Sequence, residues 1–256
     1  YFWKYDQHTN TWTQIASYPG SGTISCTGFS IGGTGYVCCG YTNGSIYKDM
    51  WAYDTTTNTW TQKASIPVAR YAAFGFVVGN KAYVGCGNAG GPPYLNDLWQ
   101  YDPNSNTWTQ LNKYPGGNKS GVMAFVLGNN AYIGGGITDG SNSFNDFWKY
   151  YPNTDSWSQI DSLPINPKGI VGEVTFSIGG KGYLGTGSTN ADWTAYNYMR
   201  TFWAYDTATG HWSKIASLPA RSRYAGVGFS IGNKGYVATG LDSTGTDLTD
   251  NWEYSP

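Results

Sequence analysis

The sequence predicts an all-β fold, a propeller of four-stranded antiparallel blades, with five blades favoured. Three observations lead to this prediction. The chain of 256 residues contains 36 Gly, 22 Tyr and 12 Trp, a composition that favours short aromatic strands separated by turns. A segment of Trp, any residue, Tyr and usually Asp recurs with its Trp at positions 3, 51, 99, 148, 203 and 252. Steps of about 50 residues between strand-rich copies are typical of propeller blades.

Each repeat supplies four strands, which we name a to d in chain order. The segment "GFVVGNKAYVGCG" (75–87), like its counterparts, reads as an apolar strand a, a Gly/Asn/Lys turn and a strand b that ends in Gly. Strand c is the Trp-x-Tyr-Asp segment. Strand d is opened by a second Trp, seven residues after the Tyr, at positions 12, 60, 108, 157 and 212. This spacing suits a tight c-d hairpin, whose Asp side chains accept backbone N–H bonds: Asp6, Asp54, Asp102 and Asp206.

The aromatic residues of the repeat are predicted to fill the space between blades. A twisted four-stranded sheet of this size cannot bury both of its faces alone, so neighbouring copies must stack around an axis. Eleven of the 12 Trp lie in the repeat frame, which indicates a packing role for each of them.

The repeat resembles that of the kelch family of β-propellers, in which a double glycine ends the second strand and a Tyr and a Trp follow, separated by six residues. The resemblance covers nearly the whole chain. The Tyr and Trp spacing holds in five copies, from Tyr5 and Trp12 to Tyr205 and Trp212. The glycine pair is intact only as Gly135 and Gly136, as in secreted bacterial kelch proteins with an eroded first glycine.

Counting strands leaves the closure of the ring open. The chain reads as one domain with repeat units at 22–63, 70–111, 119–160, 170–215 and 223–255. In a five-bladed ring, residues 1–15 close the circle and the Trp12 strand completes the last blade, but Phe2 to Asp6 and Asn251 to Ser255 then compete for one c position. The alternative is a longer ring of six or seven blades, the usual kelch number, of which this chain is a fragment.

Composition excludes some classes of function. The net charge of −1 and the pI near 6.1 give no basic surface for nucleic acid, and no apolar run is long enough to span a membrane. Few Lys and Glu beside many Asn, Thr, Ser and Gly favour a secreted or cell-surface protein. The cysteines cluster in the first third of the chain, which favours buried thiols over a disulfide framework: Cys26, Cys38, Cys39 and Cys86.

The b-c and d-a connections leave a four-stranded blade at the same end, so one face of the ring carries all of them and is the candidate binding surface. In the fourth repeat the b-c connection is long, with 16 residues from Gly187 to Trp203 against 11 or 12 elsewhere. It holds the one Trp outside the repeat frame, Trp193, together with Tyr196, Tyr198 and Arg200. These side chains could stack on a sugar or anchor a protein partner, or the loop could fold over its blade and bury them.

A second candidate site lies where the d-a connections enter the inner strands. Aligned on the Phe of strand a, Arg70, Lys119 and Arg223 occupy one equivalent position, with Arg221 close by. Cations repeated near the channel mouth could bind a carboxylate, a phosphate or an acidic sugar. They could instead pair with backbone groups or with Glu173, an inner-strand acid that needs a partner if it is buried. Other polar aromatics expected on this rim are Tyr41, Tyr47, Tyr71, Tyr94 and Tyr224.

The sequence favours a non-catalytic propeller that binds a protein or glycan through the loop face, needs no cofactor and can associate with other chains or domains. The alternative is a metal-free sugar-modifying enzyme. The resemblance extends to sialic acid mutarotases, which implies acid–base work by Glu173 with Arg70 or Arg223. A copper site like that of galactose oxidase is not expected, because His8 and His211 lie in c-d turns. The oxygen-rich loops 138–146 and 241–247 could hold calcium or be ordinary turns.

Overall fold

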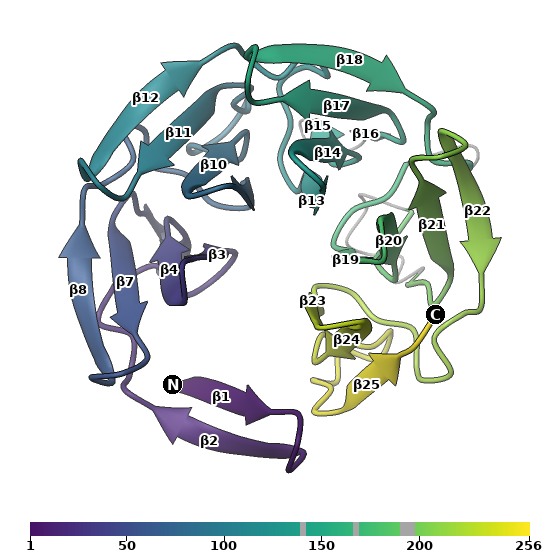
Figure 1. Ribbon diagram of the computed structural model, residues 1–256, viewed down its shortest axis with the longest axis horizontal. Helices are drawn as coiled ribbons and strands as arrows, with labels where there is room; N and C mark the ends of the chain where they lie inside the picture. Colours follow the sequence, from purple (N-terminus) through teal and green to yellow (C-terminus); the bar gives the residue numbers. More distant parts are fainter. Residues whose placement is uncertain (139–141, 166–168, 190–197) are drawn as a thin grey trace.

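The protein is an all-β propeller, as the sequence predicts. The computed structural model describes residues 1–138, 142–165, 169–189 and 198–256, and in these ranges every regular element is a β-strand. Five sheets stand around a central axis, each with strand a innermost, and an outer hairpin lies between the fifth sheet and the first (Figure 1).

The first four blades have four antiparallel strands each, and the fifth blade has three. The bounds of the blade strands are as follows, blade by blade in chain order: β3 Thr27–Ile31, β4 Thr34–Cys38, β7 Met50–Asp54 and β8 Thr59–Lys63; β9 Phe74–Val78, β10 Lys81–Gly85, β11 Leu98–Asp102 and β12 Thr107–Leu111; β13 Met123–Leu127, β14 Asn130–Gly134, β17 Phe147–Tyr151 and β18 Ser156–Ile160; β19 Val174–Ile178, β20 Lys181–Gly185, β21 Phe202–Asp206 and β22 His211–Ile215; β23 Val227–Ile231, β24 Lys234–Ala238 and β25 Asn251–Tyr254. Short hairpins extend the b-c connections of the first and third blades: β5 Tyr41–Thr42 with β6 Ser45–Ile46, and β15 Ile137–Thr138 with β16 Asn142–Ser143.

The c-d hairpins form by the predicted turn chemistry. In the first blade, Asp54 Oδ1 accepts the N–H of Thr56 at 2.7 Å, and Asn58 takes a positive φ of 54°. The Asn58 side chain then accepts the hydroxyl proton of Tyr53 at 2.9 Å, which ties the turn to strand c. These bonds set the register in which Tyr53 stands opposite Trp60. The Asp and Asn of the repeat therefore stabilise the hairpin and are not a catalytic pair.

Aromatic residues join each blade to the next, as predicted. The strand-b Tyr of one blade contacts the strand-c Tyr of the following blade, with ring centroids 5.9 Å apart for Tyr36 and Tyr101. The strand-d Trp reaches back to the preceding blade, and Trp108 Nε1 donates to the carbonyl oxygen of Ala64 at 2.8 Å. Because both contacts recur around the ring, the hydrophobic core is divided into clusters that each bridge two adjacent blades.

Residues 1–15 close the circle in a different way from the one expected. Strand β2 (Thr11–Ile15) pairs with β1 (Phe2–Asp6) in a separate two-stranded sheet and does not complete the fifth blade. The hairpin stands as the outer half of a sixth sector, because Tyr5 packs on Tyr236 of the fifth blade at 5.7 Å. On its other side, the carbonyl oxygen of Ala16 accepts Trp60 Nε1 at 2.9 Å. Both candidate c strands therefore have a place in the ring: β25 belongs to the fifth blade, and β1 lies next to that blade in the sixth sector.

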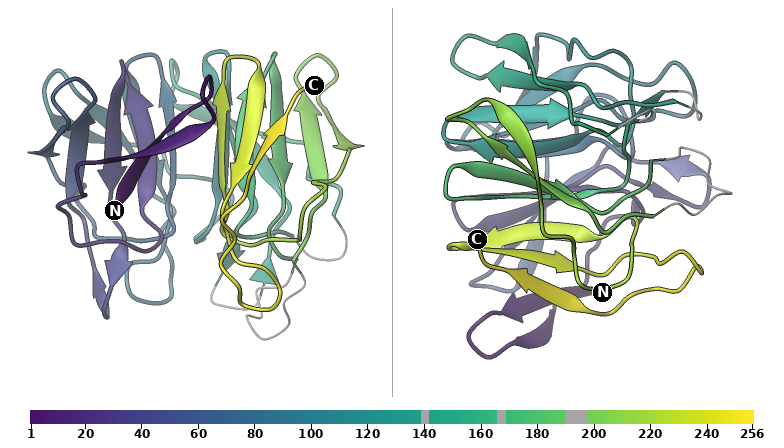
Figure 2. Two further views of the ribbon diagram at one scale, coloured as in Figure 1. Left: turned by 90° about the horizontal axis from the view of Figure 1, so that it is seen from below. Right: turned by 90° about the vertical axis from the view of Figure 1, so that its right-hand side faces the viewer.

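The ring has two unlike ends (Figure 2). Tight a-b and c-d turns form one end, and the longer b-c and d-a connections form the other, which we call the loop face. The hairpins β5-β6 and β15-β16 project from the loop face (Figure 2, left). Within the described ranges, no helix is of a length and apolarity that would let it cross a lipid bilayer.

Candidate functional site

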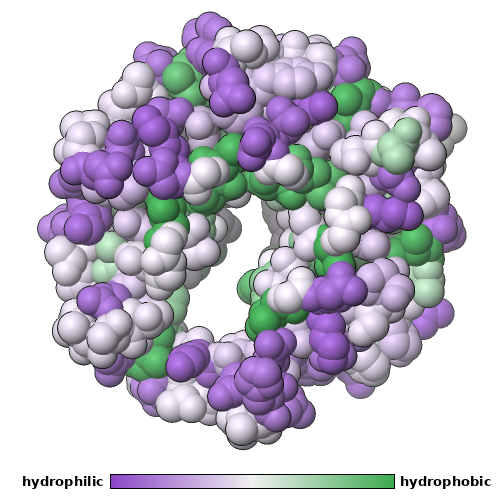
Figure 3. Space-filling model, viewed as in Figure 1, coloured by the Kyte–Doolittle hydropathy of each residue, from purple (hydrophilic) through white to green (hydrophobic). Residues whose placement is uncertain are grey.

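A channel runs along the axis of the ring, and its wall is built from equivalent inner-strand positions (Figure 3). A cavity of 780 Å³ follows this channel. One ring of small residues on its wall consists of Gly28, Gly75, Ala124, Thr175 and Gly228. A second ring, two residues earlier in each repeat, consists of Cys26, Ala73, Val122, Glu173 and Gly226. The small side chains keep the axis open, and Glu173 is the one ionisable carboxyl in the two rings.

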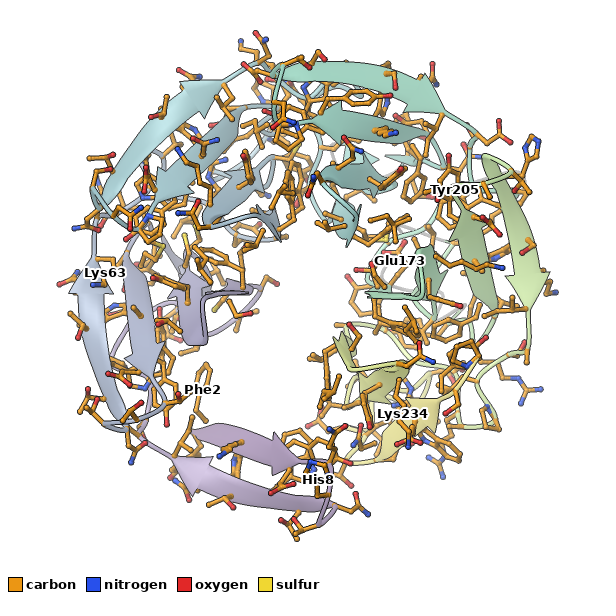
Figure 4. The ribbon with its side chains drawn as sticks, in the orientation of Figure 1. Phe2, His8, Lys63, Glu173, Tyr205 and Lys234 are labelled. Atoms are coloured by element: carbon orange, nitrogen blue, oxygen red, sulfur yellow. The ribbon has the colours of Figure 1, made fainter. Side chains whose placement is uncertain are left out.

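Glu173 sits beside the channel, immediately before β19, the strand that begins the fourth blade (Figure 4). Both of its carboxyl oxygens are buried, and neither has a hydrogen-bond partner among the described residues. Burial raises the pKa of Glu173 well above its usual value, because an ionised carboxylate loses its hydration there without compensation. Burial therefore favours the neutral carboxylic acid over the ionised form, and the neutral form can donate one proton and accept hydrogen bonds.

The repeated cations do not form a ligand site at the channel mouth, which corrects the prediction made for them. Arg70, Lys119 and Arg223 are buried, and each is paired with an Asp located 27 residues later in the chain. Arg70 forms a two-pronged ion pair with Asp97 at 2.6 and 2.7 Å. The alternative prediction, that these cations pair with backbone groups or with Glu173, holds for the backbone, since Arg70 donates to the carbonyl oxygens of Val68 and Cys86 and Arg223 to that of Thr239, but not for Glu173. These cations hold the blades together, since each pairing joins a d-a connection to the start of a strand c.

A third residue completes each of these buried pairs. The paired Asp also accepts the indole N–H of the strand-c Trp two residues later, as Asp97 does from Trp99 at 2.6 Å. Hydrogen bonds from Arg223 lower the pKa of Asp250 in the fifth blade. The fourth blade has neither the cation nor the Asp, because Ile170 occupies the cation position and Thr201 the acid position. The indole N–H of Trp203 is consequently left without a partner in the described structure.

Tyrosines of the b-c and d-a connections gather on the loop face. Tyr41 contacts Tyr71 with centroids 5.4 Å apart, and Tyr198 stacks on Tyr224 at 5.5 Å and an interplanar angle of 21°. Tyr94 and Tyr224 pack against one small apolar cluster of Ile137 and Val171. We call these five residues the tyrosine rim: Tyr41, Tyr71, Tyr94, Tyr198 and Tyr224. All five are half-buried, so each presents part of its ring to solvent from a fixed position.

The remaining predicted site residues separate into two groups. Trp193 and Tyr196 lie outside the described residues. Arg200 and Arg221 are exposed and together line a hollow of 690 Å³ at the edge of the loop face between the fourth and fifth blades. Arg221 donates to Asp242 at 2.7 Å while most of its side chain stays in solvent. The structure thus places Arg200 and Arg221, which the sequence assigned to two different candidate sites, beside one hollow.

The described residues contain no cluster of three or more His, Cys, Asp or Glu that could hold a metal ion. In the loop 241–247, Asp242 accepts the N–H and the hydroxyl of Thr244 at 2.9 and 2.6 Å. Hydrogen bonds from Thr244 and Arg221 lower the pKa of Asp242, and they occupy the oxygens that a calcium ion would use. The loop 138–146 lies partly outside the described residues. All four cysteines are free thiols.

Comparison with known proteins agrees with this geometry. Radial blades joined by the repeated Tyr and Trp define the class as a kelch-type β-propeller. The family profile described as Attractin/LZTR1 beta-propeller matches residues 35–250, and the chain belongs to this family. A solved structure titled "Structure of YjhT" superposes with a TM-score of 0.82 over 96% of this chain and 85% of that chain. The sequences are 18% identical, so this likeness concerns the fold alone. A search of the curated proteins found no match.

Sequence reasoning missed the buried acid partners, although a signal for them was present. The separation between cation and acid is 27 residues in all three pairs, and both partners are absent from the fourth repeat. In each of these three repeats the cation and the acid occur together at this fixed separation, whereas the first repeat keeps Asp49 but has Thr23 at the cation position. Residues that recur together at a fixed separation are expected to be in contact. The same comparison along the repeats would have left Glu173 unpaired, as the structure does.

Proposed function

We propose that the protein is a non-catalytic binding module that recognises a protein or a glycan through its loop face. The observation that carries the proposal is the tyrosine rim, in which residues from several blades contact one another in pairs or pack on a shared apolar cluster on the loop face. Tyrosines combine a flat apolar ring with a polar end and lose little conformational entropy on binding, so they suit contacts with sugars and with protein surfaces.

The charge distribution supports a shallow recognition surface over a catalytic one. Arg70 and Arg223 are the cations that would assist Glu173 in acid–base catalysis, but each already forms an ion pair, with Asp97 and Asp250 respectively. The exposed Arg200 and Arg221 stand at the edge of the loop face and can donate hydrogen bonds to a carboxylate or to hydroxyl groups of a ligand. Composition favours an extracellular or cell-surface setting for such a module.

Binding should be measured on a glycan array and in pull-down assays with wild-type protein, Tyr71→Ala/Tyr224→Ala and Arg200→Ala/Arg221→Ala. We expect each double variant to lose at least ~tenfold in apparent affinity, because both ring contacts and charged hydrogen bonds are removed. Trp3→Ala is the matched control, since Trp3 is an exposed aromatic on the outer hairpin, 52% accessible. If both double variants bind as the wild type does, the loop face is not the binding surface.

One observation favours a second candidate, a metal-free sugar-modifying enzyme with its site in the channel. Glu173 is a buried carboxyl on the channel wall without a hydrogen-bond partner among the described residues, and its raised pKa suits a general acid acting toward a sugar ring oxygen. The test is interconversion of sugar anomers followed by NMR, with wild type and Glu173→Gln. Acceleration that disappears in Glu173→Gln would support the enzyme. The absence of any acceleration by the wild type would remove this candidate.

A further inference from the structure

The first blade differs from three of the others at one buried position. In the second, third and fifth blades, a buried cation on the d-a connection pairs with the Asp that stands just before strand c. The first blade keeps this acid as Asp49, but it carries the exposed Thr23 at the cation position. Both members of the pair belong to one repeat in every case, so the missing cation is a property of the first repeat itself.

Asp49 consequently has one carboxyl oxygen without a partner. Its Oδ2 accepts the indole N–H of Trp51 at 2.7 Å, whereas Oδ1 is buried and forms no hydrogen bond with any described residue. The hydroxyl of Tyr18 is buried without a partner as well. Burial raises the pKa of Tyr18, and the negative charge of Asp49 raises it further. A buried carboxylate without a counter-charge is costly, and a cationic hydrogen-bond donor would remove this cost.

The third blade shows which kind of cation fits beside this acid. Lys119 donates to Asp146, whose other oxygen accepts the indole N–H of Trp148 at 2.9 Å. The ammonium nitrogen of Lys119 also lies 4.2 Å from the ring centroid of Phe144 and 5.8 Å from that of Tyr114. A carboxylate, an indole that orients it and two aromatic rings thus form an ammonium site.

The first blade has every part of this site except the lysine. The residues equivalent to the acid, the indole donor and the two rings are, in this order, Asp49, Trp51, Tyr47 and Tyr18. The backbone supports the equivalence, because the N–H of Tyr47 donates to the carbonyl oxygen of Gly40 at 2.9 Å and the third blade repeats this bond. The first blade is therefore an ammonium site that lacks its ammonium group.

The two rings favour an ammonium group over a guanidinium group. In the second and fifth blades, where the cation is Arg, the two ring positions hold aliphatic residues: Ile66 and Leu95, and Leu218 and Leu248. A compact ammonium gains cation–π attraction from rings on two sides, whereas the planar guanidinium of Arg70 is held by a two-pronged bond to its acid. With Tyr at both positions, the first blade matches the blade that carries Lys.

A hollow on the loop face leads to Asp49. It has a volume of 420 Å³ and is lined by Tyr47, Asp49 and Trp51 together with residues 19–21 of the d-a connection. Among the described residues that line it, only Lys48 is a cation, and the side chain of Lys48 is exposed. A ligand can therefore approach the acid from solvent.

The d-a connection must move aside before a ligand reaches the buried Oδ1. Gly22 of this segment packs so closely on the first blade that a Cβ there would lie 2.4 Å from the carbonyl oxygen of Cys39. In the second blade the equivalent carbonyl oxygen, that of Cys86, accepts a guanidinium N–H of Arg70 at 3.0 Å. Displacing Gly22 would thus give the ligand a second acceptor.

We propose that the first blade binds an alkylammonium group, which takes the place that Lys119 takes in the third blade. The group donates to Asp49 Oδ1 and lies against the rings of Tyr18 and Tyr47. A lysine side chain of a partner protein and a free amine both carry such a group. This site is separate from the tyrosine rim, so the proposal stands whether or not the rim is a binding surface.

The test follows the indole N–H signal of Trp51 by NMR at neutral pH, with the signal assigned through Trp51→Phe. Wild-type protein is titrated with Nα-acetyl-lysine methylamide, with butylamine, and with the uncharged norleucine analogue of the first. We expect a saturable shift with at least one amine and at least ~tenfold weaker binding of the norleucine analogue. The tighter of the two amines distinguishes a lysine side chain from a free amine.

Three results of this titration would overturn the proposal. They are the absence of a saturable shift with either amine, equal binding of the norleucine analogue, and an equal shift with potassium chloride alone. In the last case an inorganic ion would be the occupant.

Protein variants locate the binding. Asp49→Asn removes the charge and keeps an acceptor for the indole of Trp51, so we expect at least ~tenfold weaker binding of the amine. Asp54→Asn makes the same change of charge at an exposed acid of the first c-d turn and should leave the binding unchanged. Equal effects of these two variants would overturn the proposal.

A second variant tests the site without removing its acid. Thr23→Lys places an ammonium group on the chain at the position of Lys119, and because Thr23 is exposed the variant should fold. We expect it to abolish binding of the added amine, since the site is then filled from within. Unchanged binding in Thr23→Lys would overturn the proposal. Binding that appears only after Lys48→Ala would also overturn it, because Lys48 would then be the occupant.

Discussion

Arg70 and Asp97 illustrate how single residues hold this ring together. The guanidinium is fully buried, and both of its terminal nitrogens bond to the carboxylate, while a third hydrogen bond runs to the carbonyl oxygen of Cys86 at 3.0 Å. A buried cation is tolerated only when its hydrogen bonds are satisfied, which the planar guanidinium achieves with one acid and two carbonyl groups, the second being that of Val68, which accepts from Nε at 3.1 Å.

Removing this acid should be costly. We expect Asp97→Ala to lower the free energy of unfolding by about 3 to 5 kcal/mol, because Arg70 would remain buried without its counter-charge. Asp49→Ala is the control, since Asp49 accepts the indole N–H of Trp51 but has no cation partner in the described structure. Its loss should be nearer to 1 kcal/mol, the value of one hydrogen bond. Urea denaturation measures both, and equal losses would contradict the ion-pair argument.

Glu173 should make the free energy of unfolding fall as the pH rises, which is opposite to the effect of an acid in a salt bridge. Its pKa is raised in the folded state, so the native protein binds more protons than the unfolded chain above the ordinary Glu pKa. The contribution of Glu173 to the free energy of unfolding is fully present below a pH of about 4.3. It falls by about 1.4 kcal/mol per pH unit above that, until the pKa of the folded state is reached. We expect Glu173→Gln to remove this fall. Urea midpoints from pH 4 to 8 measure it, and parallel curves for the two proteins would contradict it.

At the scale of single elements, the strand-d tryptophans differ in their surroundings according to which blade precedes them. Trp108 bonds to Ala64 and packs on Tyr101 at 5.1 Å. Trp12 packs on Tyr5 at 5.0 Å, but 44% of its surface is exposed. The difference arises because the blade before Trp12 has three strands, so no carbonyl group of a preceding d strand is present among the described residues.

This difference gives a prediction for the two strands. We expect Trp108→Ala to lower the free energy of unfolding by about 3 kcal/mol, because a wedge between two blades is replaced by a cavity. Trp12→Ala should cost less than about 1 kcal/mol, as is usual for an exposed position. Chemical denaturation followed by circular dichroism compares them. Similar losses would mean that β2 lies in a complete blade boundary.

At the scale of the whole molecule, the β1-β2 sector differs from the five blades. Five sheets carry inner strands, whereas the β1-β2 sector carries only outer ones, and Tyr1, Phe2 and Tyr18 line the channel at that sector. The contacts that hold this hairpin are few and local, including those of Tyr5, Phe2 and Ala16. A two-stranded sheet without a packed inner half is marginally stable.

Hydrogen exchange should reveal this asymmetry. We expect the amides of β1 and β2 to exchange at least ~tenfold faster than those of β10 and β11, because the hairpin can open locally without unfolding a blade. Native-state exchange followed by mass spectrometry measures the difference. Equal protection would show that the sixth sector unfolds together with the rest of the ring.

The sequence by itself determined the blade, its four strands, its turns and the aromatic contacts between blades. Each of these depends on spacing within one repeat, as with Tyr53 and Trp60, so local pattern is sufficient to predict it. The sequence also predicted that Arg200 and Arg221 belong to the loop face, and it identified Glu173 as an acid that needs a partner if it is buried.

Only the tertiary structure decided which polar groups pair and how the circle closes. Arg70 could not be assigned to Asp97 from local pattern, because the pair forms between segments brought together when two blades stack. The place of residues 1–15 depended on a competition between β1 and β25 for the edge of β2, which is resolved by contacts on both sides of the hairpin. A repeated sequence makes the prediction of each blade reliable. It does not show which of several equivalent residues in different repeats are in contact, because that depends on how the blades pack.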